Sequence, residues 1–166
     1  MVSHIKSTVI RDVLAESLSE AHVNVLERLA EPKYDEDVAT ELKIKATVVR
    51  TILNDLHQNS LVEYQRTKNK KTGWYTYLWV RREEKIKDYA QTYLKTQLID
   101  LSTRLDDETK SLTFQCGCMR VPYEAAMESN FQCPTCSKEF TECDNSEVID
   151  DIVSEVSRLN SLLEQT

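Results

Sequence analysis

The sequence predicts a mainly α-helical protein with small β elements, and three observations support this fold class. Apolar residues recur every three or four positions over most of the chain, as they do on one face of a helix. Near residue 60 this spacing changes to strict alternation, which is typical of strands. All five cysteines lie between Cys116 and Cys143, and only 2 of the 166 residues are glycine and 3 are proline. Collagen-like and low-complexity classes are therefore excluded.

Four helical patterns fill the first 60 residues. One apolar stripe covers residues 5–18, and a second follows Ser19, a suitable N-cap, and ends at Pro32. A short helix is predicted over residues 35–42, where an acidic first turn suits the positive end of the helix dipole. A fourth helix is predicted over residues 46–58. Its expected core side chains, at i, i+3, i+4 and i+7, are Val49, Ile52, Leu53 and Leu56.

Two strand candidates follow, at residues 61–67 and 74–80, both rich in aromatic and β-branched residues. The polar turn between them contains three lysines and Gly73, which can adopt a positive φ. Helices followed by a two-stranded hairpin are the element order of a winged helix-turn-helix domain. We predict such a domain over residues 1–82.

The segment 83–110 predicts a long helical connector, since it contains neither Gly nor Pro. Such a helix spans about 40 Å. Its apolar stripe is spaced as in a coiled coil and would pack on its own domain or on another chain. The stripe consists of Ile86, Ala90, Tyr93, Leu94, Leu98, Leu101 and Leu105.

Two further segments complete the chain. Short strand-like pieces at residues 112–114, 121–123 and 139–141 surround the cysteines, so a zinc-ribbon domain is predicted over 111–143. The acidic segment 144–166 keeps a helical apolar stripe and predicts an amphipathic C-terminal helix.

The charge divides the chain into unlike halves. The net charge is −7, from 21 Lys and Arg against 28 Asp and Glu, which argues against a simple DNA-coating protein. Residues 1–82 carry 13 basic against 11 acidic side chains, whereas residues 83–166 carry 8 against 17. This asymmetry favours different partners for the two halves, although an acidic half can also serve solubility alone. No apolar run reaches membrane-spanning length and no signal-peptide core is evident, so an intracellular, soluble protein without a membrane partner is expected.

A cluster of four cysteines predicts one structural Zn²⁺. Cys133 and Cys136 form a Cys-x-x-Cys knuckle, whereas Cys116 and Cys118 are separated by one residue only. Gly117 would help so tight a loop to form, and Cys143 is the reserve ligand. An unmetallated reduced cluster or a redox dithiol are the alternatives. All three histidines lie in the first 60 residues, so a catalytic metal is not expected.

The hairpin, more than the fourth helix, has the composition of a nucleic-acid surface. The exposed face of that helix is nearly neutral and offers Thr47, Val48, Arg50, Thr51, Asn54 and Asp55, a poor set for reading base edges. The hairpin combines phosphate-seeking cations with stacking rings. These candidate residues are Arg66, Lys68, Lys70, Lys71, Trp74, Tyr75, Tyr77 and Trp79. Because strand faces alternate, one set of the aromatics is expected to be buried.

No catalytic constellation is present in the sequence. It contains no nucleophile with an adjacent base, no phosphate-binding loop and no paired carboxylates, so neither an enzyme nor a small-molecule substrate is predicted. We expect His57, on the fourth helix, to be a partly buried polar residue.

Three stretches together resemble the archaeal transcription factor E family, homologues of the α subunit of the eukaryotic general factor IIE. They are the hairpin strand ending in 73–79, the uninterrupted helix after Arg82, and the segment 120–136, in which an aromatic-Glu-x-Ala sequence lies between the two cysteine pairs. The likeness covers nearly the whole chain. Two positions depart from the family pattern: Cys116-x-Cys118 is one residue short, and Ser137 stands where a knuckle commonly has glycine.

The resemblance implies a basal initiation factor of an archaeal cytoplasm, associated with the nucleoid. Members of this family bind the RNA polymerase clamp, act with the TATA-binding protein and transcription factor B, and favour the open promoter complex. The hairpin would contact promoter DNA weakly near the melted region, and a β-type second subunit is possible. The alternative reading is a dimeric winged-helix, metal-containing repressor that binds operator DNA and dimerises through residues 83–110.

Overall fold

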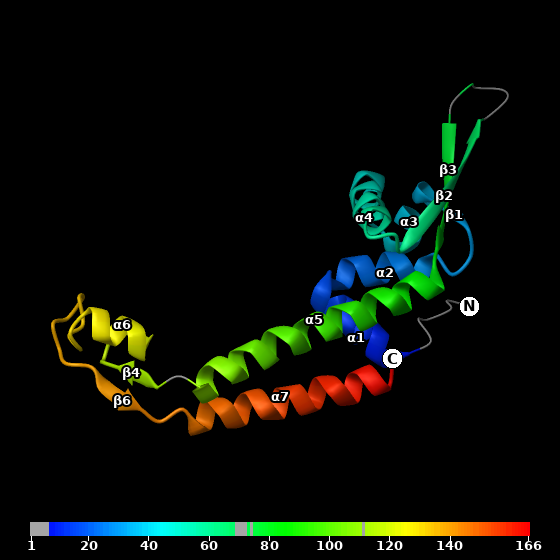
Figure 1. The fold of residues 1–166 in the computed structure, drawn as a ribbon. Helices are drawn as coiled ribbons and strands as arrows, with labels where there is room; N and C mark the ends of the chain where they lie inside the picture. Colours follow the sequence, from blue (N-terminus) through cyan, green and yellow to red (C-terminus); the bar gives the residue numbers. More distant parts are fainter. Residues whose placement is uncertain (1–6, 69–72, 74, 111) are drawn as a thin grey trace. The chain divides into compact units, whose positions relative to one another are not determined.

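Helices dominate the structure, and two small antiparallel sheets and a cysteine cluster near the C-terminus accompany them, as the sequence predicts (Figure 1). The computed structural model describes residues 7–68, 73, 75–110 and 112–166. These form two compact units. The first contains the residues up to 94 and the last four residues, and the second contains residues 95–162.

The first unit contains seven elements and the first part of an eighth. In chain order they are α1 (Thr8–Ser17), α2 (Glu20–Arg28), β1 (Lys33–Tyr34), α3 (Asp35–Leu42), α4 (Ala46–Gln58), β2 (Val62–Lys68), β3 (Tyr75–Arg81) and the beginning of α5 (Glu83–Lys110). The hairpin of β2 and β3 projects from the helices (Figure 1).

The core of this unit is the aliphatic stripe that helical periodicity predicts. In α4 the four expected side chains are all buried. Ile86, Ala90 and Leu94 of α5, spaced four residues apart, are also buried, with exposed fractions of 1% or less. Tyr93 lies beside Glu16, and burial raises the pKa of this tyrosine above its usual range. The first part of α5 therefore belongs to the domain core.

A three-stranded sheet with the order β1-β3-β2 completes the unit. The sequence analysis missed β1, which has only two residues and pairs Lys33 with Trp79. Between β2 and β3 the antiparallel register places Thr67 opposite Thr76, and their hydroxyls share a hydrogen bond of 2.8 Å. Gly73 has a φ of +73°, so the positive φ predicted for this turn residue is confirmed.

One predicted cap has a different partner. Ser19 precedes α2 as predicted, yet its side chain makes no capping hydrogen bond. Its hydroxyl instead pairs with Nδ1 of His22 at 2.8 Å, and the backbone carbonyl of Ser19 accepts the His22 N–H. The side chain of Ser7 caps α1, accepting from the N–H of Ile10.

The second unit contains the end of α5, a small sheet and two helices. Its strands, β4 (Thr113–Gln115), β5 (Arg120–Pro122) and β6 (Thr141–Cys143), form a sheet with the order β5-β4-β6. The last predicted strand lies two residues later than expected. Residue 123 begins α6 (Tyr123–Glu128), a helix that the sequence analysis missed. Its six residues are too short for apolar periodicity to be detectable.

The chain ends in α7 (Ser146–Glu164), where Ile152 and Leu159 are buried on the predicted apolar stripe. The residue before α7, Asn145, ties this helix to its neighbours. Its amide donates to the Glu108 carbonyl of α5 and to Thr113 of β4, and its oxygen accepts from Arg120 at 2.6 Å. No helix within the described ranges is both long and apolar enough to cross a membrane.

Arg81 fixes the base of the hairpin. Its side chain is only 2% exposed, donates to the Leu26 carbonyl of α2 and pairs with Glu83 at 2.6 Å, while its N–H donates to the Leu29 carbonyl. Its neighbour Arg82 is 43% exposed and lies 3.7 Å from a carboxylate oxygen of Glu63.

We therefore expect Arg81→Ala to lower the free energy of unfolding of the first unit by about 2–4 kcal/mol, because it removes a buried side chain together with its hydrogen bond to the Leu26 carbonyl and its ion pair with Glu83. Arg82→Ala, the matched control, should lower it by no more than about 1 kcal/mol, the range of an exposed ion pair. Urea unfolding followed by circular dichroism measures both. Equal losses in the two variants would contradict this role for Arg81.

Candidate metal centre and nucleic-acid interface

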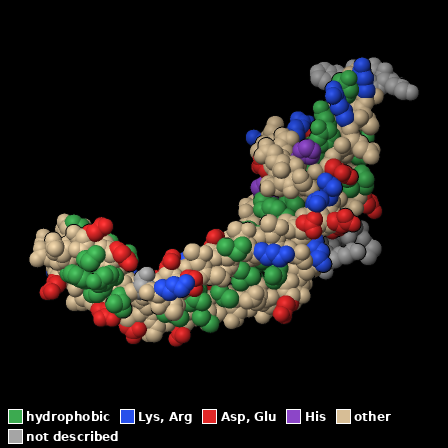
Figure 2. Space-filling model, viewed as in Figure 1, with side chains coloured by type: hydrophobic (Ala, Val, Ile, Leu, Met, Phe, Trp, Pro, Cys, Tyr) green, Lys and Arg blue, Asp and Glu red, His purple; other side chains and the backbone are tan. Residues whose placement is uncertain are grey.

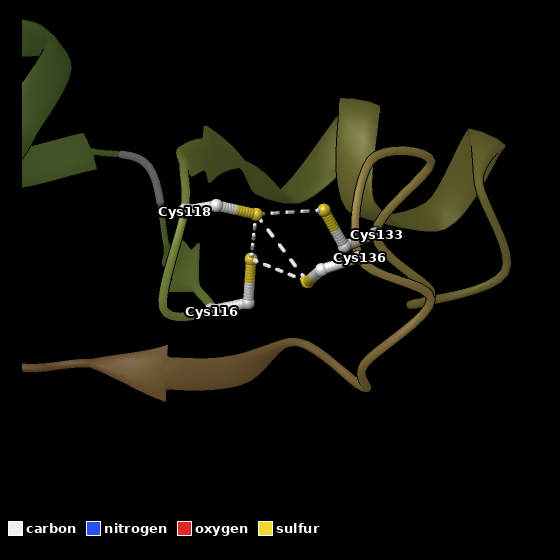
Figure 3. A group of neighbouring side chains, drawn as sticks. All are labelled: Cys116, Cys118, Cys133 and Cys136. Carbon is white, nitrogen blue, oxygen red and sulfur yellow. Dashed lines mark hydrogen bonds between the residues drawn. The ribbon is translucent and has the colours of Figure 1, made fainter.

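The structure brings the four predicted cysteine ligands together. Cys116 and Cys118 lie on the loop between β4 and β5, and Cys133 and Cys136 lie on the loop after α6, with their sulfurs pointing toward one another (Figure 3). All four sulfurs lie within 4.8 Å of one another. From Cys118 the distances to the other three sulfurs are 3.3 to 3.4 Å.

This arrangement fits a tetrahedral metal. With Zn–S bonds of about 2.3 Å, the sulfurs of a tetrahedral site lie roughly 3.8 Å apart, close to the distances observed here. A disulfide needs about 2.05 Å, and all five cysteines are free. Cys143 lies outside the cluster, because its thiol faces the Asp144 carbonyl at 3.6 Å. The cluster is therefore complete without the reserve ligand.

The pKa values of two of the clustered thiols shift in opposite directions. Burial raises the pKa of Cys133, but hydrogen bonds from the backbone of Cys136 and Thr135, and then from neighbouring thiols, lower this pKa to about 6. In Cys118, hydrogen bonds with the sulfurs of Cys136, Cys116 and Cys133 raise the pKa, so this thiol retains its proton when no metal is bound. Zinc binds thiolates, and one of the four is already stabilised in that form.

The surrounding core is too small to hold this unit's sheet alone. Around the cluster only Ala126, Cys133 and Phe140 are buried among the described residues, and one of the three is itself a candidate ligand. Phe114 and Phe131 pack against them with ring centroids 5.1 Å apart. A metal would supply the cross-links that so few apolar contacts cannot.

The two departures from the family pattern have different consequences. Gly117 is not in the left-handed region, and a Cβ built there meets nothing within 4 Å, so the structure shows no special contribution of glycine to this loop. The short loop closes through the Cys116 N–H, which donates to the Met119 carbonyl at 3.0 Å. Ser137 does adopt a left-handed φ of 55°, which costs an L-residue on the order of 1 kcal/mol. Its N–H still makes the turn bond to the Cys133 carbonyl at 2.8 Å.

The described part of the predicted nucleic-acid surface lies on one face of the hairpin. The register sets Lys68 opposite Tyr75, Arg66 opposite Tyr77, and Tyr64 opposite Trp79. Opposed residues share a face, and residues two apart along a strand share it as well. These six residues form what we call the hairpin stripe. Basic and hydrophobic side chains gather along the hairpin in Figure 2.

Exposure changes along the hairpin stripe. Tyr75 is 48% and Tyr77 38% exposed, whereas Trp79, at the base, is only 6% exposed. The set of Tyr75, Tyr77 and Trp79 is therefore not buried as a whole, since the projecting end of the hairpin has no core to cover it. The Arg66 guanidinium lies 3.5 Å from the centre of the Tyr75 ring. Lys70, Lys71 and Trp74 lie outside the described residues.

Two members of this aromatic surface were missed in the sequence analysis. Tyr64 packs on Trp79 at 4.9 Å and on Tyr77 at 5.2 Å between ring centroids. His57 of α4 is exposed, so its prediction as a partly buried residue is wrong, and its ring lies 5.2 Å from that of Tyr64. For Tyr64, the available signal was its alternation with Arg66 and Lys68 along β2, which puts all three side chains on one face.

The only cation among the six residues predicted on the exposed face of α4 is already neutralised. Arg50 forms ion pairs with Asp35 and, at 3.5 Å, with Glu36, both in the first turn of α3. Recognition of guanine by arginine needs a free guanidinium, so an arginine held in these ion pairs is poorly suited to it. The acidic start of α3 thus opposes duplex binding by α4.

Comparison with known proteins gives a consistent family. A model of the TFIIE alpha subunit family matches residues 8–110. A transcription factor E of Methanocaldococcus jannaschii is 35% identical over 131 residues, which cover 78% of this chain and 76% of that protein. A transcription factor E of Methanosarcina barkeri is 31% identical over 156 residues, 92% of this chain and 95% of that protein.

A solved structure is similar in fold. It is described as a possible transcriptional regulator from Methanosarcina mazei, and it superposes with a TM-score of 0.53 over 58% of this chain and 86% of its own. At 18% identity this likeness concerns the fold alone.

The metal site yields a matched pair of variants. Cys133→Ser removes a buried ligand, and we expect it to abolish stoichiometric zinc binding and to unfold residues 111–143 while the first unit stays folded. Cys143→Ser, outside the cluster, should retain one zinc per chain. Zinc content by mass spectrometry and the amide spectrum by NMR test both. Equal zinc loss in the two variants would contradict the four-cysteine site.

The Arg50 ion pairs yield a second prediction. Replacing Asp35→Asn and Glu36→Gln together should raise the affinity for duplex DNA about three- to tenfold and steepen its salt dependence, since Arg50 becomes free for a phosphate. Glu63→Gln, a charge change on the opposite face of the hairpin, is the control and should alter affinity less than twofold. Fluorescence anisotropy at several salt concentrations measures this. Identical gains from the control would show general charge, not Arg50, to be responsible.

Proposed function

The chain belongs to the family of the TFIIE alpha subunit and archaeal transcription factor E, a family of transcription initiation factors, and we propose that it acts at the promoter by binding the RNA polymerase clamp and favouring DNA opening. Proteins of this family act in initiation with RNA polymerase, the TATA-binding protein and transcription factor B, and the same partners are proposed here. Transcription factors of this kind are typically not enzymes.

In this proposal the first 82 residues are a winged helix-turn-helix domain. Its support is the element order, in which α3 and α4 precede the β2–β3 hairpin, and the short strand β1 joins the sheet beside β3. The connector 83–110, a zinc ribbon over 111–143 and the acidic helix 144–166 complete the proposed organisation.

The observation that carries the DNA role is the contrast between α4 and the hairpin stripe. The exposed face of α4 offers duplex DNA one cation, Arg50. Ion pairs with Asp35 and Glu36 neutralise the charge of this side chain. The stripe offers Arg66 and Lys68 beside exposed tyrosine rings. Aromatic rings beside cations suit single strands better than base edges in a groove. We therefore place the melted strand on the hairpin, with Lys70, Lys71 and Trp74 as further proposed contacts.

The four clustered cysteines would hold one structural Zn²⁺. The four thiolates would cross-link the two cysteine loops through the ion, and because they would fill a tetrahedral site, no position would remain open for a reaction. The role of the ion would be to fold the ribbon. The ribbon and α7 then present an acidic surface, with 10 Asp and Glu against 3 Lys and Arg over residues 111–166. That surface suits basic regions of protein partners.

A second subunit would find an apolar surface on the later part of α5. There Ile99 is 66% exposed, and Leu98 lines a shallow depression with it. Binding of a β-type subunit over Leu98 and Ile99 would remove these apolar side chains from water and would explain their exposure in the single chain.

The proposed mechanism is a population shift. Promoter complexes exchange between closed and open states, and a factor shifts them only by the ratio of its affinities for the two. The hairpin stripe can engage DNA strands once they separate, so the open state gains contacts that the closed state lacks. A dimeric operator-binding repressor, the alternative, would instead need a DNA-reading face on α4.

Variants of the stripe test the DNA role. Arg66→Ala with Lys68→Ala should reduce the fraction of open complex at a weak promoter about tenfold, because phosphate contacts specific to separated strands are lost. Binding to polymerase should be unchanged. Lys85→Ala, an exposed cation of α5, is the matched control and should open the promoter normally. Permanganate footprinting of unpaired thymines measures opening, and undiminished opening in the double variant would refute the role.

A further inference from the structure

A groove lies between α4 and the base of the hairpin. It has a volume of about 320 Å³ and is open to solvent. Six side chains from four elements line it: Asp35, Arg50, Asn54, Tyr64, Tyr77 and Trp79. Its size is at the lower end of the range for small-molecule sites in proteins.

One face of α4 is turned toward this groove. Arg50, Asn54 and His57 are spaced by four and three residues, which puts them in one row along the helix. The His57 ring packs 5.2 Å from Tyr64 and 6.2 Å from Trp79, so the row meets the hairpin. Arg50 and Asn54 of α4 therefore line the groove together with the aromatic rings of the hairpin.

The chemistry of the lining matches one flat, polar-edged aromatic molecule. Tyr64 and Tyr77 are 42% and 38% exposed and offer ring surface for stacking. The exposed amide of Asn54 provides a donor and an acceptor, and the Asp35 carboxylate has acceptor positions in addition to its ion pair with Arg50. The groove thus combines stacking surface with hydrogen-bonding groups.

Cations continue from the groove along the hairpin. Arg66 is opposite Tyr77 in the register, and Lys68 is the next residue on that face. A ligand that is aromatic in the groove and anionic along the hairpin is complementary to this surface. A nucleotide strand has both properties, with one phosphate for each base.

We propose that this groove binds one unstacked nucleobase of a single strand whose phosphates follow Arg66 and Lys68, an inference that rests on the proposed contact with melted DNA. A base in an intact duplex must leave its stack to enter, whereas a base in melted DNA is already free of its partner. Asn54 and Asp35 favour a base with an exocyclic amine, such as adenine, over thymine, which has none.

The test uses the full chain and short strands of about ten abasic deoxyribose phosphates. One probe carries a single central adenine, a second carries thymine, and a third carries no base. For the wild-type protein we expect the adenine probe to bind about 5- to 100-fold more tightly than the baseless strand, the range of one stacked base. The thymine probe should lie between them. Fluorescence anisotropy at low salt gives the affinities.

Variants assign the effect to the groove. Three substitutions alter the groove: Tyr64→Leu and Tyr77→Leu, which keep apolar bulk, and Asn54→Ala, which keeps helix propensity. Each should reduce the difference in affinity between the adenine probe and the baseless strand, and none should change the affinity for the baseless strand. Tyr123→Leu, an exposed tyrosine of the second unit, is the matched control and should behave as wild type. Arg66→Ala with Lys68→Ala should weaken all three probes alike.

Two results overturn the inference. Equal affinity of the wild type for the adenine and baseless strands would show that no base is bound, and unchanged discrimination in all three groove variants would place the base elsewhere. If the affinity for the three probes still falls in the Arg66 and Lys68 double variant, the DNA role of the hairpin is retained after either result. If the Arg66 and Lys68 variant binds every probe as tightly as wild type, the proposed contact with DNA fails as well.

Discussion

The antiparallel register between β2 and β3 is the constraint on which the functional surface depends. Because Thr67 faces Thr76, cations of one strand and aromatic rings of the other fall on the same face. A shift of the register by one residue would move Arg66 and Lys68 to the opposite face of the hairpin, away from the aromatic rings. The hydroxyl pair of Thr67 and Thr76, on the other face, stabilises the register without occupying the functional surface. Arg81 then anchors the hairpin to α2.

The second unit depends on a different constraint. Around its sulfur cluster only Ala126, Cys133 and Phe140 are buried among the described residues, so we expect folding of the ribbon to be coupled to metal binding, whereas the first unit has an aliphatic core of its own. Charge also distinguishes the two halves of the sequence, since residues 1–82 are nearly balanced and can approach DNA, whereas the acidic residues 83–166 are better suited to protein surfaces. This division is consistent with a factor that obtains most of its promoter affinity from a larger assembly.

Periodicity and spacing predicted those parts of the fold whose determinants are local. The stripe of α4 and the cysteine cluster follow from residues close together in sequence, and both are found as predicted. Two-residue β1 and six-residue α6 were missed because neither is long enough for a pattern. The neutralisation of Arg50 and the groove with Tyr64 were missed for another reason. They join α3, α4 and the hairpin, and only tertiary packing reveals such neighbours.

The central claim is that one face of β3, and not the other, meets separated DNA strands. A photoreactive benzoylphenylalanine placed at Tyr75 or at Thr76 compares the two faces at adjacent residues. In open promoter complexes the account predicts strong crosslinking to the separated DNA strands from position 75 and little from position 76. Equal crosslinking from both positions, or crosslinks from position 75 to intact duplex only, would contradict it.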